Sequence, residues 1–396
     1  MFLVRQAHSD DLPTLLKLAK MVHFINLPAD KDIIAAKIGR SRKSFSGQAK
    51  DPHERQFMFV LEDSESGAVI GTSAIMSCIS WPGWPHVFLQ VRRRSYFSED
   101  LQHGSVHTTV QFATDESGPS EVGGLILAPG YRGHRERLGS LLSLIRLHFV
   151  GLHRAEFADR MLAELMGPVT PDSQTLLWEY LGRRFINLSY DEADLFCQHS
   201  KEFMTSLWPR DEMHASVLPA EARALIGKVG EETVAAKAML ERQGFTFNGQ
   251  VDPFDGGPYL EAKTDEIPLV RATRAMKLAG AIDDAGAGGA KGSDGAKRGD
   301  GAKGASRAES ASTGFVSFRS KEHGFRAVRS RIGIDGEGVR LPESVIDLLG
   351  ARKGIEIGVT PLDAPSEAKG RSRRAGQRSS LSALADLPGD AGSAAA

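Results

Sequence analysis

A sharp change in composition limits what this 396-residue chain can fold into. The stretch "GAIDDAGAGGAKGSDGAKRGDGAKGASRAESAST" (280–313) is mostly Gly, Ala, Ser, Asp and Lys, and GAK recurs within it. Such a segment buries too little apolar surface to offset the entropy lost on ordering. We therefore expect a flexible linker over 276–313, with one body before it and a smaller unit after it.

The smaller unit spans 314–362 and alternates short strands with one helix, "PESVIDLLG". Its stretch "GVRLPESVIDLLGARKGIEIGVTPL" resembles the strand–helix–strand of swapped-hairpin barrels, some of which dimerise or bind DNA. The sequence predicts a small β-rich accessory or oligomerisation module. The low-complexity tail at 363–396 is expected to be disordered.

The charge balance and the cysteine content exclude several classes of protein. Lys plus Arg number 49 and Asp plus Glu 50, which argues against a general nucleic-acid binder. Cys78 and Cys197 are the two cysteines and lie far apart, which favours a reducing compartment. The start is charged too early for a signal peptide, and no apolar run reaches the roughly 20 residues of a membrane helix. We expect a cytoplasmic protein with no membrane partner.

The body reads as an α+β fold, a mixed sheet flanked by helices. Apolar runs bounded by turn residues predict strands at 2–7, 123–129, 160–168 and 184–190, and a hairpin at 56–75. Helical periodicity and capping residues predict helices at 9–22, 30–45 and 172–182.

The stretch "YRGHRERLGSLLSLIRLHF" (131–149) follows one of these strands and opens a helix. A strand, a basic glycine-containing loop and a helix form a common pyrophosphate site, because the helix amides and dipole face the anion. The loop has neither the G-K-[ST] ending of nucleoside-triphosphate loops nor the GxGxxG of dinucleotide loops. It therefore indicates a different phosphate-bearing ligand.

The arrangement resembles the GCN5-related N-acyltransferase fold, whose pyrophosphate loop has the form Q/R-x-x-G-x-G/A. Here the loop reads His134-x-x-Arg137-x-Gly139, so an arginine stands where the first glycine is expected. A narrower resemblance, to the arginine N-succinyltransferase family, covers residues 1 to about 275. It is carried by "FVLEDSESGAVIGTSAI" (59–75), "SEVGGLILAPGYR" (120–132), "LWEYLGRRFINLSYDEADLFC" (177–197) and "VDPFDGGPYLE" (251–261).

This resemblance implies an acyl-CoA-binding domain over 1–190 and a second acyltransferase-like half over 191–275 that completes the acceptor site. It implies succinyl-CoA, or another acyl-CoA, as co-substrate with no permanently bound cofactor. The implied acceptor is a small amine, the α-amine of arginine, and the implied assembly is a homo- or hetero-oligomer.

The resemblance, together with the chemistry of the basic loop, gives the candidate ligand-binding residues. The donor would contact Leu125, Ile126, Leu127, Arg132, Gly133, Arg135, Arg137, Gly139 and Ser140. Glu121 could face the acceptor amine, and Asp255 could bind its guanidinium, although "FDGGP" could also be only a tight turn. No metal site is expected, because His148 and His153 have no partners at metal-ligand spacing.

The catalytic position departs from the family pattern, because Gly230 stands where the family has a histidine. Three explanations stay open. Glu231 or Glu232 supplies the base, His214 reaches the site from elsewhere, or the chain has kept the fold and lost or changed the activity. In the last case the chain would bind CoA or an amino acid as a regulatory protein. A DNA-binding role through 314–362 is a third, remoter function.

Overall fold

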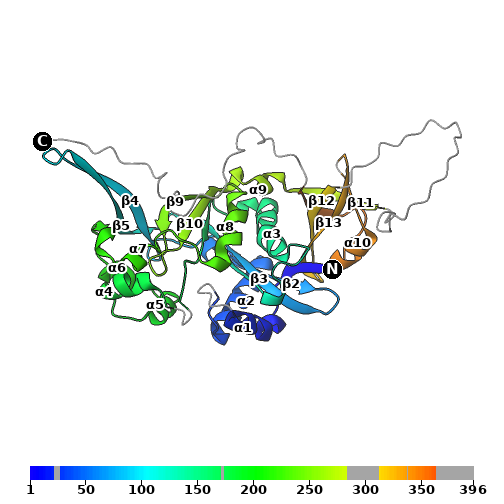
Figure 1. Cartoon of the computed structure of the whole chain (residues 1–396). Coiled ribbons are helices and arrows are strands. Elements are labelled where there is room, and N and C mark those ends of the chain that lie inside the picture. The colour runs from blue at the N-terminus through cyan, green and yellow to red at the C-terminus, as the bar shows by residue number, and fades with distance from the viewer. Residues whose placement is uncertain (22–26, 171–173, 283–311, 337, 363–396) are drawn as a thin grey trace.

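The computed structural model describes residues 1–21, 27–170, 174–282, 312–336 and 338–362 (Figure 1). Their strands form one 15-stranded sheet in the order β12-β15-β11-β14-β13-β1-β2-β3-β6-β7-β10-β9-β4-β5-β8. The strands are β1 (Phe2–Gln6), β2 (Gln56–Asp63), β3 (Ala68–Met76), β4 (His86–Ser98), β5 (His103–Asp115), β6 (Ser120–Leu127), β7 (Arg160–Glu164), β8 (Met213–His214), β9 (Thr246–Val251), β10 (Pro258–Lys263), β11 (Arg274–Ala281), β12 (Ser312–Ser320), β13 (Gly324–Asp335), β14 (Gly338–Leu341) and β15 (Glu356–Pro361).

Helices cover both faces of the central strands. They are α1 (Leu12–Met21), α2 (Lys31–Phe45), α3 (Leu138–Leu152), α4 (Arg183–Phe185), α5 (Tyr190–Cys197), α6 (Glu202–Leu207), α7 (Ala220–Arg223), α8 (Val234–Glu241), α9 (Pro268–Ala272) and α10 (Glu343–Leu349). α1 and α2 bury apolar side chains against β2 on one face, and α3, α8 and α9 pack on the other. Among the described helices, none is long and apolar enough to cross a membrane.

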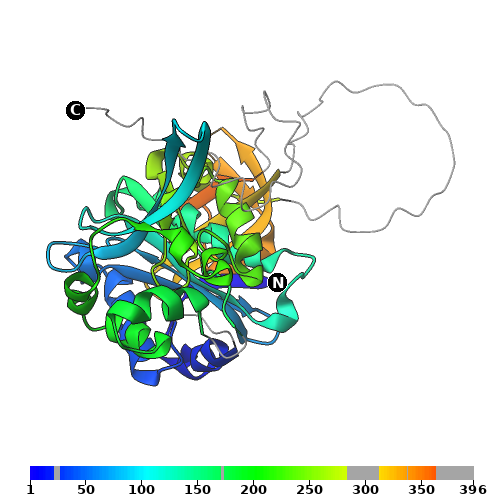
Figure 2. The same ribbon diagram turned by 60° about the vertical axis from the view of Figure 1, so that its left-hand side comes forward.

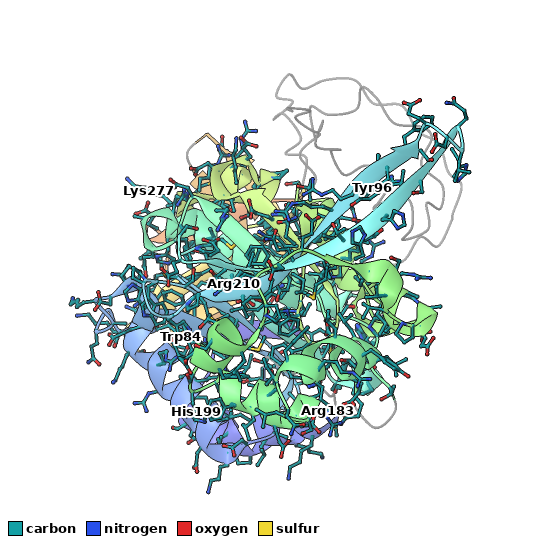
Figure 3. All side chains as sticks on the ribbon, turned by 90° about the vertical axis from the view of Figure 1, so that its left-hand side faces the viewer. Trp84, Tyr96, Arg183, His199, Arg210 and Lys277 are labelled. Carbon is teal, nitrogen blue, oxygen red and sulfur yellow. The ribbon has the colours of Figure 1, made fainter. Side chains whose placement is uncertain are left out.

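The predicted hairpin at 56–75 is confirmed as β2 and β3, and the helices predicted at 9–22 and 30–45 are confirmed as α1 and α2 in their described parts. Asp30 caps α2 by accepting the amides of Asp32 and Ile33 at 2.8 and 2.9 Å. The β4–β5 hairpin stands away from the body (Figure 2). Tyr96 lies along this hairpin, as Figure 3 shows.

The predicted strand at 184–190 is wrong, because this segment ends one helix and begins the next. Ser189 and Glu192 form a reciprocal cap at the start of α5, in which each side chain accepts the other's amide. The S-x-x-E spacing therefore outweighed the apolar alternation of "RFINLSY". The proposed boundary at 190 also falls at the first residue of this helix.

The predicted start of the linker at 276 is wrong as well. Residues 274–281 form β11, which pairs in parallel with β14 and antiparallel with β15. β12 pairs with both β13 and β15, so the five strands β11–β15 close into a ring. β13 also pairs with β1, which joins the ring to the main sheet. The expected end of the linker at 313 falls inside β12, which begins at Ser312. Residues 283–311 of the expected linker, and the expected tail at 363–396, lie outside the described residues.

Candidate active site

A groove opens where two neighbouring parallel strands separate. β6 and β7 pair at Ser120–Met161 and Glu121–Leu162, and both strands then continue without pairing to each other. On its other side β6 carries a bulge, where Gly124 and Leu125 face the single residue Ser73 of β3. Gly124 adopts a φ of +59°, a conformation that favours glycine. The bulge redirects the backbone of β6 at the entrance to the groove.

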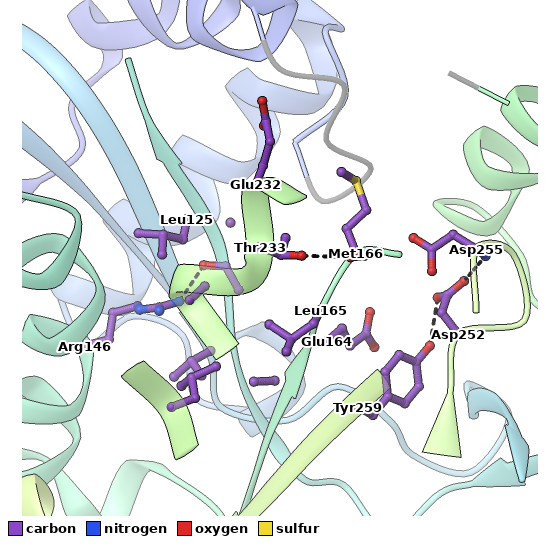
Figure 4. Close-up of a pocket in the computed structure, with 16 residues that line it drawn as sticks. Leu125, Arg146, Glu164, Leu165, Met166, Glu232, Thr233, Asp252, Asp255 and Tyr259 are labelled. Atoms are coloured by element: carbon purple, nitrogen blue, oxygen red, sulfur yellow. Dashed lines mark hydrogen bonds between the residues drawn. The ribbon is translucent and has the colours of Figure 1, made fainter. Parts of the chain in front are cut away.

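A pocket fills this separation and extends toward β10 (Figure 4). It is lined by Val122, Gly123, Gly124, Leu125, Arg146, Ala163, Glu164, Leu165, Met166, Glu232, Thr233, Ala236, Leu240, Asp252, Asp255 and Tyr259. Its walls therefore come from β6, β7, α3, α8, β10 and the turn before β10.

The basic loop leads from β6 into α3 at one end of this pocket. Arg137, at the cap of α3, has φ +50° and ψ +53°, which is the left-handed conformation that glycine adopts most easily. An arginine thus stands where a glycine was expected, in a backbone conformation that favours glycine. Ser140 and Leu141 already donate their amides to Arg137 O, at 2.9 and 3.1 Å, so the amides of Leu138 and Gly139 are the first-turn groups that an anion could use.

The donor-binding candidates do not all face the same space. Leu125 lines the pocket, whereas Ile126 is buried against α1 and α2. Leu127 lies beneath Gly139, and Ser140 is half-buried in the first turn of α3. The loop residues Gly133, Arg135 and Arg137 are exposed.

Arg132 bridges the loop to the far wall of the pocket. Its guanidinium donates to both carboxylate oxygens of Glu232, at 3.0 and 3.4 Å. Glu232 therefore lines the pocket but points toward the loop, while Glu231 is exposed and lies outside the lining. Gly230 donates its amide to Met166 O at 2.9 Å, and a Cβ at Gly230 would lie 2.9 Å from the carbonyl oxygen of Gly167. A histidine could not be placed here without a shift of that backbone.

His214, the other candidate base, lies outside this pocket. It belongs to β8 at the edge of the sheet, and its Nε2 is 3.3 Å from the hydroxyl of Tyr96 on the β4–β5 hairpin. In the described part of the chain no group of three or more potential metal ligands comes together.

Acidic side chains gather at the β10 end of the pocket. Asp255 accepts the amides of Gly167 and Gly257 at 2.9 and 2.7 Å, and Asp252 accepts the hydroxyl of Tyr259 at 2.9 Å. Burial raises the pKa of Asp252, and burial together with the charge of Asp252 raises that of Asp255 well above its usual range. This end of the pocket therefore favours a cationic ligand.

Glu164 stands between the acidic end and the groove. Its side chain is 24% exposed, and its Oε1 lies 3.5 Å from Nδ1 of His86. Burial, and then the charges of Glu121 and Asp252, raise the pKa of Glu164 well above its usual range. Burial lowers the pKa of His86 to about 3, so this imidazole is neutral near pH 7.

Glu121, the other acceptor candidate, is on β6 at the last residue that pairs with β7. It is 4% exposed, and its Oε1 has no hydrogen-bond partner among the described residues. Burial raises its pKa to about 7, against the opposing charges of Lys37, Lys201 and Arg146. Glu121 is thus buried where β6 and β7 part but does not line the pocket, whereas Asp255 lines it from the second half of the body.

Sequence reasoning missed Arg146, Glu164, Asp252 and Tyr259. Two signals were present. Arg146 is a lone arginine within the apolar run "LLSLIRLHF", and Asp252 and Tyr259 flank the "FDGG" turn at a spacing that lets them meet. In that turn a Cβ at Gly257 would lie 1.9 Å from Leu165 O, so the close approach to β7 requires glycine.

Comparisons with known proteins fit this geometry. A family model described as "Arginine N-succinyltransferase beta subunit" matches residues 2–269. The chain is 32% identical over 282 residues to "Arginine N-succinyltransferase" of Shigella dysenteriae serotype 1 (strain Sd197), covering 70% of this chain and 81% of that protein. The protein of the same name from Escherichia coli (strain K12 / DH10B) gives the same figures.

A solved structure, "The structure of arginine/ornithine succinyltransferase subunit AI from Pseudomonas aeruginosa", has a TM-score of 0.72 at 24% sequence identity. The match covers 91% of this chain and 98% of that chain. The two chains share a fold, and the shared part extends well beyond residue 269.

Proposed function

The chain belongs to the arginine N-succinyltransferase family, and on that premise we propose that it transfers the succinyl group of succinyl-CoA to the α-amine of arginine. The observation that carries the proposal is the separation of β6 from β7 into a pocket with buried carboxyl groups at its far end. Such a pocket suits an acyl thioester along one strand and a cationic amine facing it.

The donor would enter from the loop side. The pyrophosphate would lie over the first turn of α3, at Gly139 and Ser140, with Arg132, Arg135 and Arg137 around it and Gly133 allowing close approach. The pantetheine arm would follow β6 past Leu125, where the strand bulges and no longer pairs with β7. The thioester then falls at the point where the two strands part.

The acceptor would approach from the opposite end. Its guanidinium would lie near Asp252 and Asp255, whose oxygens are held by backbone amides and by Tyr259. Glu121 would add negative charge from beneath the groove. Binding a cation here would offset the burial of these carboxylates, which is otherwise unfavourable.

We propose that Glu164 removes the proton from the attacking amine. It faces the pocket, and its raised pKa is better matched to an amine than that of an exposed carboxylate. The C–N bond then forms as the C–S bond breaks, and the released thiolate takes up a proton to give free CoA. Glu232, tied to Arg132, would instead hold the loop against the pocket wall.

The test is incubation of the purified protein with succinyl-CoA and a panel of amines, followed by thiol release and by mass analysis of the amine. We expect release with arginine and formation of its N-succinyl product. No free CoA with any amine would contradict the proposal. Tight CoA binding without turnover would favour a regulatory protein, the alternative that the glycine at position 230 raises.

Glu164→Gln should lower kcat by about 100-fold or more, as expected for loss of a positioned base. Glu232→Gln should instead raise KM for the acyl-CoA, because it frees Arg132. The exposed Glu221→Gln on α7 is the matched control and should change neither constant. If Glu164→Gln and Glu232→Gln lowered kcat equally, Glu164 could not be assigned as the base and Glu232 as the residue that holds the loop.

A further inference from the structure

Arg146 is a buried cation on the wall of the acyl pocket. It lies on α3, is 3% exposed and lines the groove between β6 and β7. Its Nε donates to Ser143 O, and its two terminal nitrogens donate to Ser143 Oγ and to Gly123 O, each at 2.9 Å. The guanidinium is therefore fixed between α3 and β6 and points toward the pocket (Figure 4).

These partners are all uncharged. Burial lowers the pKa of Arg146 to about 10, against the attraction of Glu121, so the group stays cationic near pH 7. A guanidinium has five N–H groups, and the hydrogen bonds formed within the described residues use three of them. One N–H on each terminal nitrogen remains, and a carboxylate can accept two parallel hydrogen bonds from such a pair.

Glu121 attracts Arg146 but forms no hydrogen bond with it among the described residues, so the two remaining N–H groups lack an acceptor. Buried N–H groups without an acceptor are unfavourable, and a ligand can supply the missing acceptor. The pocket is also polarised, with Arg146 at the β6 end, Asp252 and Asp255 at the β10 end, and Glu164 between them. A neutral ligand would pair with neither charged end of the pocket. An anionic group on the donor would pair with the cationic end, and a cationic group on the acceptor would pair with the acidic end.

The position of Arg146 along α3 fits the donor rather than the acceptor. It lies eight residues after Leu138, the first residue of α3, which corresponds to about 12 Å along the helix axis from the amides that face the pyrophosphate. It bonds Gly123, two residues before Leu125 on the strand that would carry the pantetheine arm. The far end of the donor, beyond the thioester, would come to lie beside it.

We propose that Arg146 selects the acyl donor by binding the terminal carboxylate of a dicarboxylic acyl group. This inference rests on the proposed function and deepens it. Donors whose acyl chain ends in a methyl group are poor substrates, because they leave two N–H groups of the Arg146 guanidinium buried without an acceptor.

The test compares Arg146→Met and Arg146→Lys with the wild type, using succinyl-CoA and butyryl-CoA. Butyryl-CoA has the same acyl chain length with a methyl group in place of the carboxylate. We expect the wild type to prefer succinyl-CoA by about 100-fold or more in kcat/KM, since a site built for a polar group rejects the analogue that lacks it.

Arg146→Met should lower kcat/KM for succinyl-CoA by a similar factor, chiefly through KM, and leave that for butyryl-CoA within a few-fold. Arg146→Lys should recover part of the preference. An equal fall in kcat/KM with succinyl-CoA and butyryl-CoA would overturn the proposal, because Arg146 would then only hold α3 against β6. Thermal unfolding of each variant separates that bracing role from donor selection.

Calorimetric binding of the two thioesters without acceptor keeps this inference separate from the proposed function. If the protein turns over neither donor, tighter binding of succinyl-CoA that is lost in Arg146→Met would still support the role of Arg146. Equal affinity of the wild type for both thioesters would overturn it.

Discussion

Replacing Arg137 with glycine should stabilise the chain and at the same time weaken its hold on acyl-CoA. The backbone at Arg137 is left-handed, with φ +50° and ψ +53°. This conformation brings Cβ close to the following carbonyl oxygen and disfavours a non-glycine residue by about 1–2 kcal/mol. Glycine removes that strain, but it also gives the unfolded chain more freedom, which opposes the gain by about 0.5–1 kcal/mol.

The net stabilisation should therefore be about 0.5–1 kcal/mol, enough to raise Tm by about 1–3 °C in a chain of this size. The affinity for acyl-CoA should fall by about 3- to 10-fold, because one exposed cation beside a phosphate contributes about 1 kcal/mol. Arg137→Lys should keep the affinity and leave Tm unchanged.

The assay is thermal unfolding without ligand together with calorimetric titration of CoA. Gln102, at the tip of the β4–β5 hairpin, is the matched control, because it too has a left-handed backbone, with φ +46°. Gln102→Gly should raise Tm and leave CoA binding as it is. A fall in Tm for Arg137→Gly would refute the left-handed conformation, and unchanged CoA affinity would refute the role of the loop.

Three further outcomes follow from the same structure. Gly257→Ala should destabilise the protein by about 3 kcal/mol in urea unfolding, because its Cβ would meet Leu165 O at 1.9 Å. Gly244 is the control, because its backbone is left-handed but open space surrounds it. Gly244→Ala should lower the free energy of unfolding by only about 1 kcal/mol. The rate of the wild type should fall as the pH drops through the raised pKa of Glu164, since a base must be unprotonated. Glu164→Gln should abolish this fall on the acidic side of the pH–rate profile. Burial lowers the pKa of His148 to about 3, below its unfolded value near 6.5, so stability should be lost as the pH falls from 6.5 toward 3. Protonation of His148 should lower the free energy of unfolding by about 2 kcal/mol between pH 7 and pH 5, as measured by urea unfolding at the two pH values. A smaller loss in His148→Gln would confirm that His148 is the group responsible.

Local signals in the sequence predicted the parts of the fold that local chemistry decides. The capped helix at 30–45, the hairpin at 56–75 and the strand–loop–helix ending at 149 each depend on residues within a few positions of one another. The segment 184–190 was mistaken because two local signals competed there, and the Ser189–Glu192 cap outweighed the alternation.

Contacts between distant segments could not be predicted in this way. The parallel pairing of β11 with β14 spans the low-complexity segment, and neither strand alone indicates its partner. The acidic end of the pocket is similar, because Glu164 and Asp252 meet only when β7 and β10 pair. Arg146 looked like one charge on an apolar helix, and its role depends on the strand that it faces.

The strands after the low-complexity segment bear directly on the candidate active site, although the family model ends at residue 269. Arg329 on β13 donates to the carbonyl oxygen of Glu136 in the basic loop at 2.9 Å. Near the other end of α3, the His148 ring lies 2.7 Å from Ser317 Oγ and 2.6 Å from Thr360 Oγ1. The strand ring β11–β15 thus holds the helix that carries Arg146 near both ends. A donor site requires fixed geometry between loop and pocket, so we propose that the ring, which also pairs with β1 through β13, helps to hold that geometry.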